Sequence, residues 1–318
     1  AEIGAGAFAG CESLVSITIS ENMTKISEGA FNGCVSLESA VVPGTIKEIG
    51  KDAFKGCTNL KQLTLNEGIL TIGDNAFASC VKLSTVTLPN SLTKINKGAF
   101  SKCGKINNIV LTDGLTYIGE GVFEECEGLD SVSISKNITK LEDNMFYGCT
   151  ALINIDIPSN ITEIGESVFA KCKNMKKLSI PNSVTKIGES AFQDCTNITE
   201  ISIPSSVTSI GKNAFSRCIY LKSMVLPIGL TKIERGLFDD CMYLTSVVIP
   251  ETVTSIGDGA FWGCKSIEKI NVPANVTTIG KEAFKDCVNL KDLKLPSAAT
   301  IGNEAFSGCN KDLIIEKY

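Results

Sequence analysis

The chain contains fourteen cysteines and no histidine, so its thiols are the first side chains to consider for chemistry. Thiols can pair as disulfides, ligate metal ions or act as nucleophiles. The absence of histidine excludes a His-dependent catalytic triad, a His general base and a His-ligated zinc site. A metal site built from C-x-x-C pairs is excluded too, because all the cysteines are far apart in sequence and no such pair occurs.

The spacing of the cysteines is regular. They recur at every twenty-third position from Cys11 to Cys287, and the final step, to Cys309, is one residue shorter. Each follows a phenylalanine by three residues, and all nine prolines follow a cysteine by nine residues. Such a repeat predicts a solenoid, in which each repeat is one rung packed on its neighbours. The cysteines then form a ladder with parallel side chains, which is poor disulfide geometry. We interpret them as small buried apolar residues.

Each repeat contains two stretches with strand periodicity. Apolar residues alternate with polar ones six and eight positions after the cysteine, as at Leu63 and Leu65, and proline ends this strand. A second apolar pair, such as Val184 and Ile187, predicts a shorter strand. Glycine usually follows, as at Gly188, where we expect a corner with positive φ. The Ala-Phe stretch before the next cysteine predicts a turn or two of 3₁₀ or α-helix.

The full motif of one repeat, L-x-x-I-x-I-P-x-x-V-T-x-I-G-x-x-A-F-x-x-C, resembles the BspA-like, or treponemal-type, leucine-rich repeat. The residues that carry the resemblance in one representative unit are Pro181, Val184, Thr185, Ile187, Gly188, Ala191, Phe192 and Cys195. The resemblance covers essentially the whole chain. It implies an α/β solenoid, a right-handed and curved stack of about 13 units with a parallel β-sheet on its concave face and 3₁₀ or helical turns elsewhere.

We expect residues 1–318 to form a single solenoid domain. The sequence starts inside a repeat at Ala1, without an initiator methionine, and is therefore expected to be a fragment of a longer protein. The last unit, residues 297–318, is irregular because it is one residue shorter than the others. Within it, Leu313 to Ile315 are expected to form a terminal strand.

The family resemblance also implies a function. Its members resemble surface or secreted proteins of host-associated bacteria and some protist parasites, and several act as adhesins. It implies a non-catalytic recognition or adhesion module, extracellular or at the cell surface, that binds a protein or glycan ligand on a host or neighbouring cell. Two alternatives remain open: a structural or self-assembling surface protein, with possible self-association, and an intracellular scaffold for protein interactions. We expect no cofactor and no metal ion.

Composition narrows the classes of function further. The net charge of −5, the isoelectric point near 5.1 and the lack of a basic stripe argue against nucleic-acid binding. No apolar run reaches the roughly 18 residues that a membrane span requires. No glycine-rich phosphate loop follows a strand, and no carboxylate pair lies in an obvious cleft, so we do not expect an enzyme.

Aromatic residues outside the phenylalanine series are rare, and they single out one region. Tyr220 and Tyr243 occupy the same position in adjacent repeats, and Trp262 lies two residues before the next cysteine. We expect these residues and their neighbours to crowd one edge near the Phe-to-Cys turn, with the composition of an interface core. The alternative is sequence drift or local cover for a shifted core. The candidate interaction patch comprises Arg217, Ile219, Tyr220, Arg235, Met242, Tyr243 and Trp262.

A second, weaker candidate is the outward-facing side of the longer strands. Its residues are mostly hydroxyl, amide and valine side chains, without a single aromatic residue in the series. Such a surface could bind a peptide or glycan shallowly, or could simply be the solvated face of a sheet. The concave-face candidates are Ser131, Ser133, Asn154, Asp156, Lys177, Ser179, Ser223 and Ser246.

Overall fold

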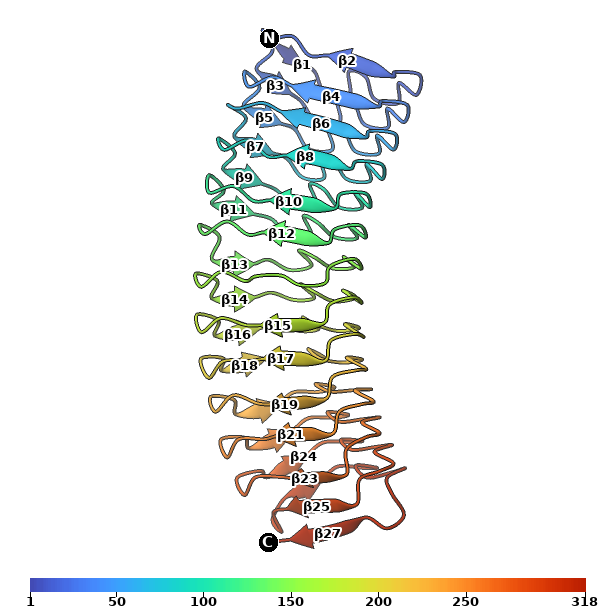
Figure 1. Cartoon of the computed structure of the whole chain (residues 1–318), viewed down its shortest axis with the longest axis vertical. Helices are drawn as coiled ribbons and strands as arrows, with labels where there is room; N and C mark the ends of the chain where they lie inside the picture. Colours follow the sequence, from blue (N-terminus) through green and yellow to red (C-terminus); the bar gives the residue numbers. More distant parts are fainter. The chain divides into compact units, whose positions relative to one another are not determined.

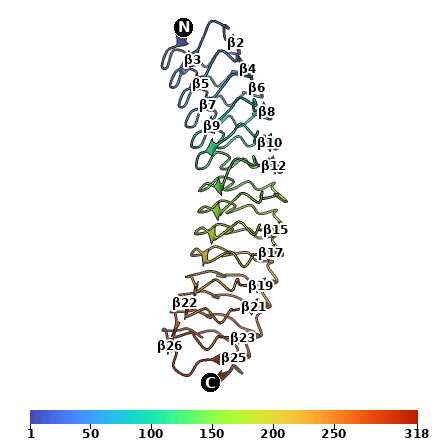
Figure 2. The same ribbon diagram turned by 90° about the vertical axis from the view of Figure 1, so that its left-hand side faces the viewer.

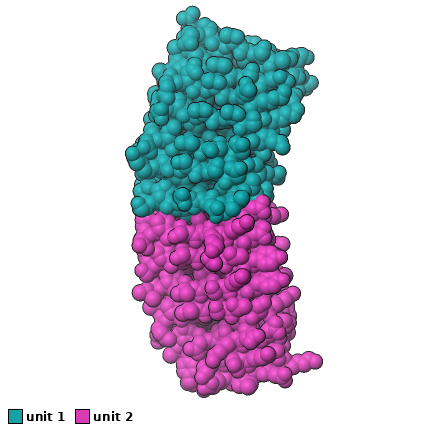
Figure 3. Space-filling view, in the orientation of Figure 1, with its two compact units in different colours: residues 1–160 teal, residues 161–318 magenta.

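The computed structural model describes all residues from 1 to 318. The chain divides into two compact units, Ala1–Asn160 and Ile161–Tyr318, shown in teal and magenta in Figure 3. Each unit is a stack of rungs in which parallel strands from successive repeats lie side by side. Figures 1 and 2 show a column of short strands and a column of long strands on different sides of each stack.

In the first unit, six short strands form one uninterrupted parallel ladder. These strands are β1 (Glu2–Ile3), β3 (Lys25–Ile26), β5 (Glu48–Ile49), β7 (Thr71–Ile72), β9 (Lys94–Ile95) and β11 (Tyr117–Ile118), and β13 (Lys140–Leu141) follows them in the chain. The long strands form two sheets that separate between β8 and β10. They are β2 (Ser16–Thr18), β4 (Ser39–Val42), β6 (Gln62–Leu65) and β8 (Thr85–Thr87), followed by β10 (Asn108–Val110) and β12 (Ser131–Ser133).

The second unit repeats this arrangement. Its short strands are β14 (Glu163–Ile164), β16 (Lys186–Ile187), β18 (Ser209–Ile210), β20 (Lys232–Ile233), β22 (Ser255–Ile256), β24 (Thr278–Ile279) and β26 (Thr300–Ile301). Its long strands are β15 (Lys177–Ser179), β17 (Glu200–Ser202), β19 (Ser223–Val225), β21 (Ser246–Val248), β23 (Lys269–Asn271), β25 (Asp292–Leu295) and β27 (Ile314–Lys317). The short-strand ladder separates between β18 and β20, and the long-strand ladder between β17 and β19 and between β21 and β23.

The register of the strands follows the sequence repeat. Glu2 pairs with Lys25, and Lys25 in turn pairs with Glu48, so Cα partners lie one repeat apart in sequence. The prolines lie where expected, after the long strand. Pro43 follows β4, and its carbonyl accepts a hydrogen bond of 3.0 Å from the Ile46 N–H, which closes a turn. Pro43 therefore ends a strand and begins the corner that leads to the short strand, and the other prolines do the same except Pro158, whose repeat forms no long strand.

A third ladder runs through the segment between the short strand and the cysteine. The Phe31 N–H donates to the Ala53 carbonyl of the next rung at 2.7 Å, whereas the Cys34 N–H donates to the Phe31 carbonyl three residues back at 3.2 Å. Residues in the left-handed conformation lie on both sides of the Ala30-Phe31 pair, at Gly29 (φ 61°) and Gly33 (φ 73°). This segment therefore forms a ladder of turns, which we call the turn ladder.

The turn ladder overturns the predicted α/β class. The chain contains no helix, and the stretch expected to be 3₁₀ or helical consists of turns. A helix needs consecutive right-handed residues so that N–H groups reach carbonyls of the same segment. Here each repeat places left-handed residues on both sides of its Ala-Phe pair, and every second N–H points to the neighbouring rung instead.

The corner glycines also differ from the expectation. Gly188, Gly211 and Gly257 do not have positive φ. They are required because the backbone of the preceding rung is too close for a side chain. A Cβ at Gly211 would lie 2.4 Å from the backbone nitrogen of Glu189. Close approach, and not a left-handed conformation, selects glycine at this position.

The core is a set of columns that run along each stack. Phenylalanine rings of successive rungs are stacked, with centroids 4.8–6.0 Å apart in the first unit and 5.1–5.8 Å apart in the second. All but Phe8 and Phe306 are fully buried. Leucine and isoleucine of both strands fill the rest of the interior. No single rung could bury these residues, and stacking removes them from water everywhere except at the terminal rungs, where Phe8 and Phe306 stay partly exposed.

The cysteines form a column beside the phenylalanines, and all fourteen are free thiols. The Sγ of Cys34 donates to the carbonyl of Phe8 in the preceding rung at 3.1 Å, and the same bond recurs along both stacks at 3.0–3.3 Å. From Cys34 to Cys287 the cysteines are small buried residues, as expected, and also donors that satisfy carbonyls, whereas Cys11 is exposed and Cys309 is half-buried. Because all its regular elements are short strands, the structure offers no candidate for a membrane-spanning helix.

Candidate functional site

The predicted patch lies where the turn ladder of the second unit meets its cysteine column. We call the set Arg217, Ile219, Tyr220, Met242, Tyr243 and Trp262 the aromatic edge. The rings of Tyr220 and Tyr243 stack with centroids 5.1 Å apart, and the two residues are 46% and 53% exposed. The backbone holds them in register, because the Tyr243 N–H donates to the carbonyl of Ile219 in the preceding rung at 3.1 Å.

Part of the aromatic edge encloses a cavity of about 450 Å³. Its lining consists of Arg217, Ile219, Asp239, Asp240, Met242 and Trp262. Sequence reasoning found four of these residues and missed the two aspartates. The repeat itself contained the signal, since Asp239 precedes Trp262 by one full repeat and Asp240 follows Arg217 by the same interval. Residues one repeat apart are neighbours in the stack, so both carboxylates had to lie between the arginine and the indole.

Among the charged groups around this cavity, the guanidinium has an ion-pair partner, whereas the two aspartates do not. The guanidinium of Arg217 pairs with Asp194, with Nε and Oδ1 3.0 Å apart. Asp239 is half-buried and accepts a hydrogen bond of 3.2 Å from the Ser216 hydroxyl. Burial, together with the charge of neighbouring Asp240, raises the pKa of the Asp239 carboxyl, because the Ser216 hydrogen bond and the charge of Arg217 compensate only in part.

Trp262 is fixed by the rung that follows it. Its Nε1 donates to the carboxylate of Asp286 at 3.0 Å, and the ammonium of Lys285 lies 5.3 Å from the ring centroid. Lys285 is itself paired with Glu282 and Glu304, at 2.8 and 3.2 Å. The residues that share the cavity with Trp262 come from the preceding rungs. The indole is therefore held on one side and lines the cavity on the other.

Of the predicted patch, Tyr220, Tyr243 and Arg235 do not line this cavity. Arg235 is exposed at the start of a turn segment, where its carbonyl accepts from the Asn213 N–H at 2.9 Å. Other exposed apolar residues lie on the two rungs that contain Tyr220 and Tyr243. Val225 and Val248 are register partners in β19 and β21 and are 66% and 56% exposed, and Ile228 is 71% exposed. Sequence reasoning did not separate them from valines at the same position in other repeats.

All eight long-strand candidates are exposed. Asn154 and Asp156 belong to a segment that forms no strand, whereas Ser131 and Ser133 lie in β12 and the remaining four in β15, β19 and β21. A cavity of about 430 Å³ opens on this side of the first unit, where the ladder separates between β8 and β10. Its lining of Ser, Thr, Asn, Val and Leu includes none of the eight residues that were predicted.

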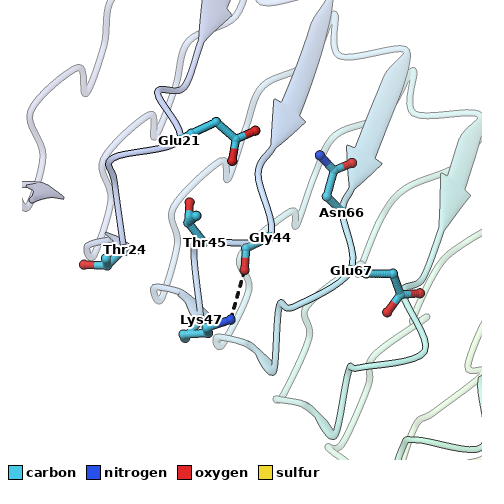
Figure 4. Close-up of a pocket in the computed structure, with 7 residues that line it drawn as sticks. All are labelled: Glu21, Thr24, Gly44, Thr45, Lys47, Asn66 and Glu67. Carbon is cyan, nitrogen blue, oxygen red and sulfur yellow. Dashed lines mark hydrogen bonds between the residues drawn. The ribbon is translucent and has the colours of Figure 1, made fainter.

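A third cavity lies in the first unit at the corners that follow β2, β4 and β6 (Figure 4). Its polar groups mostly hold neighbouring corners together. The ammonium of Lys47 donates to the carbonyls of Gly44 and Gly68, both at 3.0 Å. The Glu67 carboxylate accepts from the backbone N–H groups of Asn90 and Ser91, and these bonds lower its pKa. We interpret this site as structural.

Comparison with known proteins gives a consistent result. A sequence profile described as BspA type leucine rich repeat region (6 copies) matches residues 1–107, 93–222 and 185–312. A leucine-rich repeat protein from Bacteroides ovatus is 27% identical, with a TM-score of 0.78 over 96% of this chain and 91% of that one.

Two further solved structures are similar. A leucine rich cell surface protein from Faecalibacterium prausnitzii is 26% identical, with a TM-score of 0.59 over 95% and 85% of the two chains. A leucine-rich repeat protein from Eubacterium ventriosum is 24% identical, with a TM-score of 0.55 over 91% and 94%, and supports the fold alone. No curated protein matches the chain.

Proposed function

The chain belongs to the BspA-type leucine-rich repeat family, and on that premise we propose that it is a non-catalytic recognition module that binds a protein or glycan ligand through the aromatic edge. Proteins of this architecture present an extended surface on a scaffold whose rungs are alike. Recognition then depends on the rungs that differ from the rest. In this chain the rungs from Arg217 to Trp262 differ most in aromatic and apolar content.

The observation that carries the proposal is an exposed, stacked tyrosine pair on the two rungs whose Ile219 and Met242 line a cavity together with Trp262. Tyr220, Tyr243 and Trp262 are 40–53% exposed on consecutive rungs, and the neighbouring repeats have Asn197 and Ser266 at the position of the two tyrosines. Tyrosine, tryptophan and arginine dominate the energetics of most interfaces. A half-exposed aromatic pair next to a cavity supports a contact surface, because exposed apolar clusters of this kind usually mark interaction sites.

We also propose that the protein acts at the cell surface or outside the cell. The support is the likeness to the cell surface protein from Faecalibacterium prausnitzii, which is 26% identical over most of both chains. The test of location is fractionation of the source organism with an antibody to this chain. Recovery in the cytosol alone would favour the intracellular scaffold instead.

The contact surface can be tested with a double truncation. The chain and its Tyr243→Ala/Trp262→Ala variant are screened by biolayer interferometry against extracellular-matrix proteins and a glycan panel. We expect the ligand bound by the unaltered chain to bind the variant at least roughly 30-fold more weakly, because the loss of even one interface anchor costs about 2 kcal/mol or more.

The matched control is Tyr117→Ala, which removes a tyrosine of similar exposure (48%) from a short strand of the first unit. Its affinity should stay within about twofold of the unaltered chain. Sedimentation velocity of all three proteins tests the alternative role, because self-assembly through the same edge would be lost in the double variant only. Unchanged ligand affinity together with unchanged sedimentation would rule out the aromatic edge as a contact surface.

A further inference from the structure

The cavity beside Trp262 has two chemically different parts. Ile219, Met242 and the indole provide apolar and aromatic surface, and Asp239 and Asp240 provide two carboxylates. Its volume of about 450 Å³ is within the range of sites that bind small ligands or inserted side chains. A group that fits both parts has an apolar stem and a cationic end.

The two carboxylates have no cationic partner of their own. The one cation in the lining, Arg217, is engaged by Asp194, which lies outside the lining. No ion pair involves Asp239 or Asp240. The lysine nearest to the indole, Lys285, is held by two glutamates of its own. The cavity therefore has a net negative charge that the protein does not neutralise.

The repeat supplies an internal comparison. A cavity at the corresponding place in the first unit is lined by Val81, Lys102, Gly104, Lys105, Glu125 and Glu127. There lysines accompany the carboxylates, and Lys102 pairs with Glu125 at 3.7 Å. That cavity has no aromatic wall. The cavity in the first unit is thus balanced in charge, whereas the corresponding cavity in the second unit is acidic and has an aromatic wall. The difference comes from the side chains and not from the backbone of the repeat.

We propose that the cavity beside Trp262 binds a lysine or arginine side chain of a protein partner. The carboxylates of Asp239 and Asp240 would accept charge-assisted hydrogen bonds from the cationic end. The indole would contribute a cation–π contact, and Met242 and Ile219 would cover the alkyl stem. This inference rests on the proposed recognition function and narrows the ligand to a protein with an exposed basic side chain at its contact surface.

The half-buried position of Asp239 supports the same assignment. Burial and the neighbouring Asp240 raise the pKa of its carboxyl, which indicates that negative charge at this place lacks full compensation. A cation inserted between the two carboxylates would supply that compensation. No other charged side chain of the lining is free to do so.

Trp262 is the only tryptophan of the chain, so its intrinsic fluorescence reports on this cavity and on no other place. The experiment titrates the full chain with pentalysine, pentaarginine and pentaglutamate peptides, and follows Trp262 emission at low salt and at physiological salt. We expect a saturable change with the two basic peptides and none with pentaglutamate.

The test variant is Asp239→Asn/Asp240→Asn, which keeps side-chain shape and leaves at residue 240 an asparagine, a residue that tolerates its left-handed φ of 52°. The control variant is Glu124→Gln/Glu125→Gln, which removes two carboxylates from the same positions of a repeat in the first unit. Both variants change the net charge equally. We expect the dissociation constant for pentalysine to rise at least tenfold in the test variant and less than twofold in the control.

The outcomes separate this inference from the proposed function. The cation assignment is wrong if basic peptides leave Trp262 emission unchanged. It is also wrong if the affinity for these peptides falls equally in the test and control variants. If a ligand from the screen loses affinity in Tyr243→Ala/Trp262→Ala but not in Asp239→Asn/Asp240→Asn, the aromatic edge is a contact surface without cation recognition. Loss of that ligand in both variants, with the control unaffected, supports both proposals.

Discussion

At the scale of single residues, the turn ladder imposes an unusual requirement on the backbone. Sixteen non-glycine residues have positive φ, between 51° and 62°. Each such residue costs roughly 1–2 kcal/mol relative to a right-handed conformation. Asparagine and aspartate account for several of them, as at Asn75 and Asp194, in keeping with the short polar side chains that tolerate this region. Ser79, Lys102 and Glu125 have no such advantage.

This requirement gives a prediction for Ser79, whose φ is 61°. Ser79→Gly should stabilise the chain by about 0.5–1 kcal/mol, because relief of the left-handed strain exceeds the added flexibility of the unfolded chain. Urea unfolding followed by circular dichroism measures the change. The control is Ser131→Gly, in the extended strand β12, which should lower stability by roughly 0.5–1 kcal/mol. Two changes of the same sign would contradict the explanation.

Residue types alone predicted most of the core and little of its hydrogen bonding. The regular series of phenylalanine, cysteine and leucine identified the buried columns, because an apolar residue repeated at one position of a solenoid must face the interior. The bond from the thiol of Cys34 to the carbonyl of Phe8 could not be foreseen. It depends on the turn geometry between Phe and Cys, and the same residue types would also suit a helical turn.

At the scale of elements, the three ladders differ in how far the sequence determined them. The alternation around Leu63 and Leu65 predicted β6, and the pair at Val184 and Ile187 predicted a short strand that the structure has as β16. The turn ladder was mistaken for helix, because its short segment has helix-compatible composition. Propensity could not reveal that every second N–H bonds to the next rung, since that is a tertiary contact.

The corner between short strand and turn ladder gives a prediction about close packing. Gly211→Ala should destabilise the chain by about 2–3 kcal/mol, because its Cβ would lie 2.4 Å from the backbone of Glu189, which cannot move without breaking the ladder. Gly104→Ala is the matched control, since no atom lies within 4 Å of its Cβ position. Its effect should be neutral or stabilising by up to roughly 1 kcal/mol. Equal thermal midpoints for the two variants would show that the corner is more adaptable than the structure indicates.

At the scale of the whole molecule, the cysteine column ties stability to pH. Burial raises the pKa of the thiols at Cys57 and Cys126 to about 12, and it raises those of other buried cysteines in both units as well. In the unfolded chain each thiol ionises near its usual pKa of about 8.5. Above that pH the unfolded state has lost protons that the folded state keeps, so the contribution of each thiol to stability is complete below about pH 8.5 and declines as the pH rises.

Ten such thiols, Cys34 included, act together, which predicts a steep loss of stability in mild alkali. Each contributes a slope approaching about 1.4 kcal/mol per pH unit above pH 9. The urea midpoint, measured in the presence of reductant at pH 7.5, 8.5 and 9.5, should therefore fall sharply over the last step. Cys126→Ala should be less stable at pH 7.5 and should show a shallower decline. A flat midpoint up to pH 9.5 would mean that the thiols are not buried in protonated form.

Some residues of the candidate site could be predicted from the repeat sequence and others could not. Departures from the regular pattern identified Tyr220, Tyr243 and Trp262, because a rare residue type is conspicuous against uniform rungs. Asp239 and Asp240 were overlooked, because acidic residues are common on turns and only their neighbours across the stack make these two unusual. Arg235 was included because it is near in sequence, whereas the structure places it at the start of a turn segment, outside the cavity.

The constant register between rungs has a consequence for the gene that encodes the chain. Unequal recombination between two repeats adds or removes a whole rung, and every remaining side chain keeps its place in the column, since partners stay one repeat apart. An insertion or deletion of a single residue is tolerated only outside the ladders, because inside them it would shift the register. The shortened last repeat illustrates this limit, because the missing residue falls between β25 and β26, and Thr300 still pairs with Thr278. A lineage can therefore vary the number of rungs freely and alter recognition by replacing side chains on one or two of them.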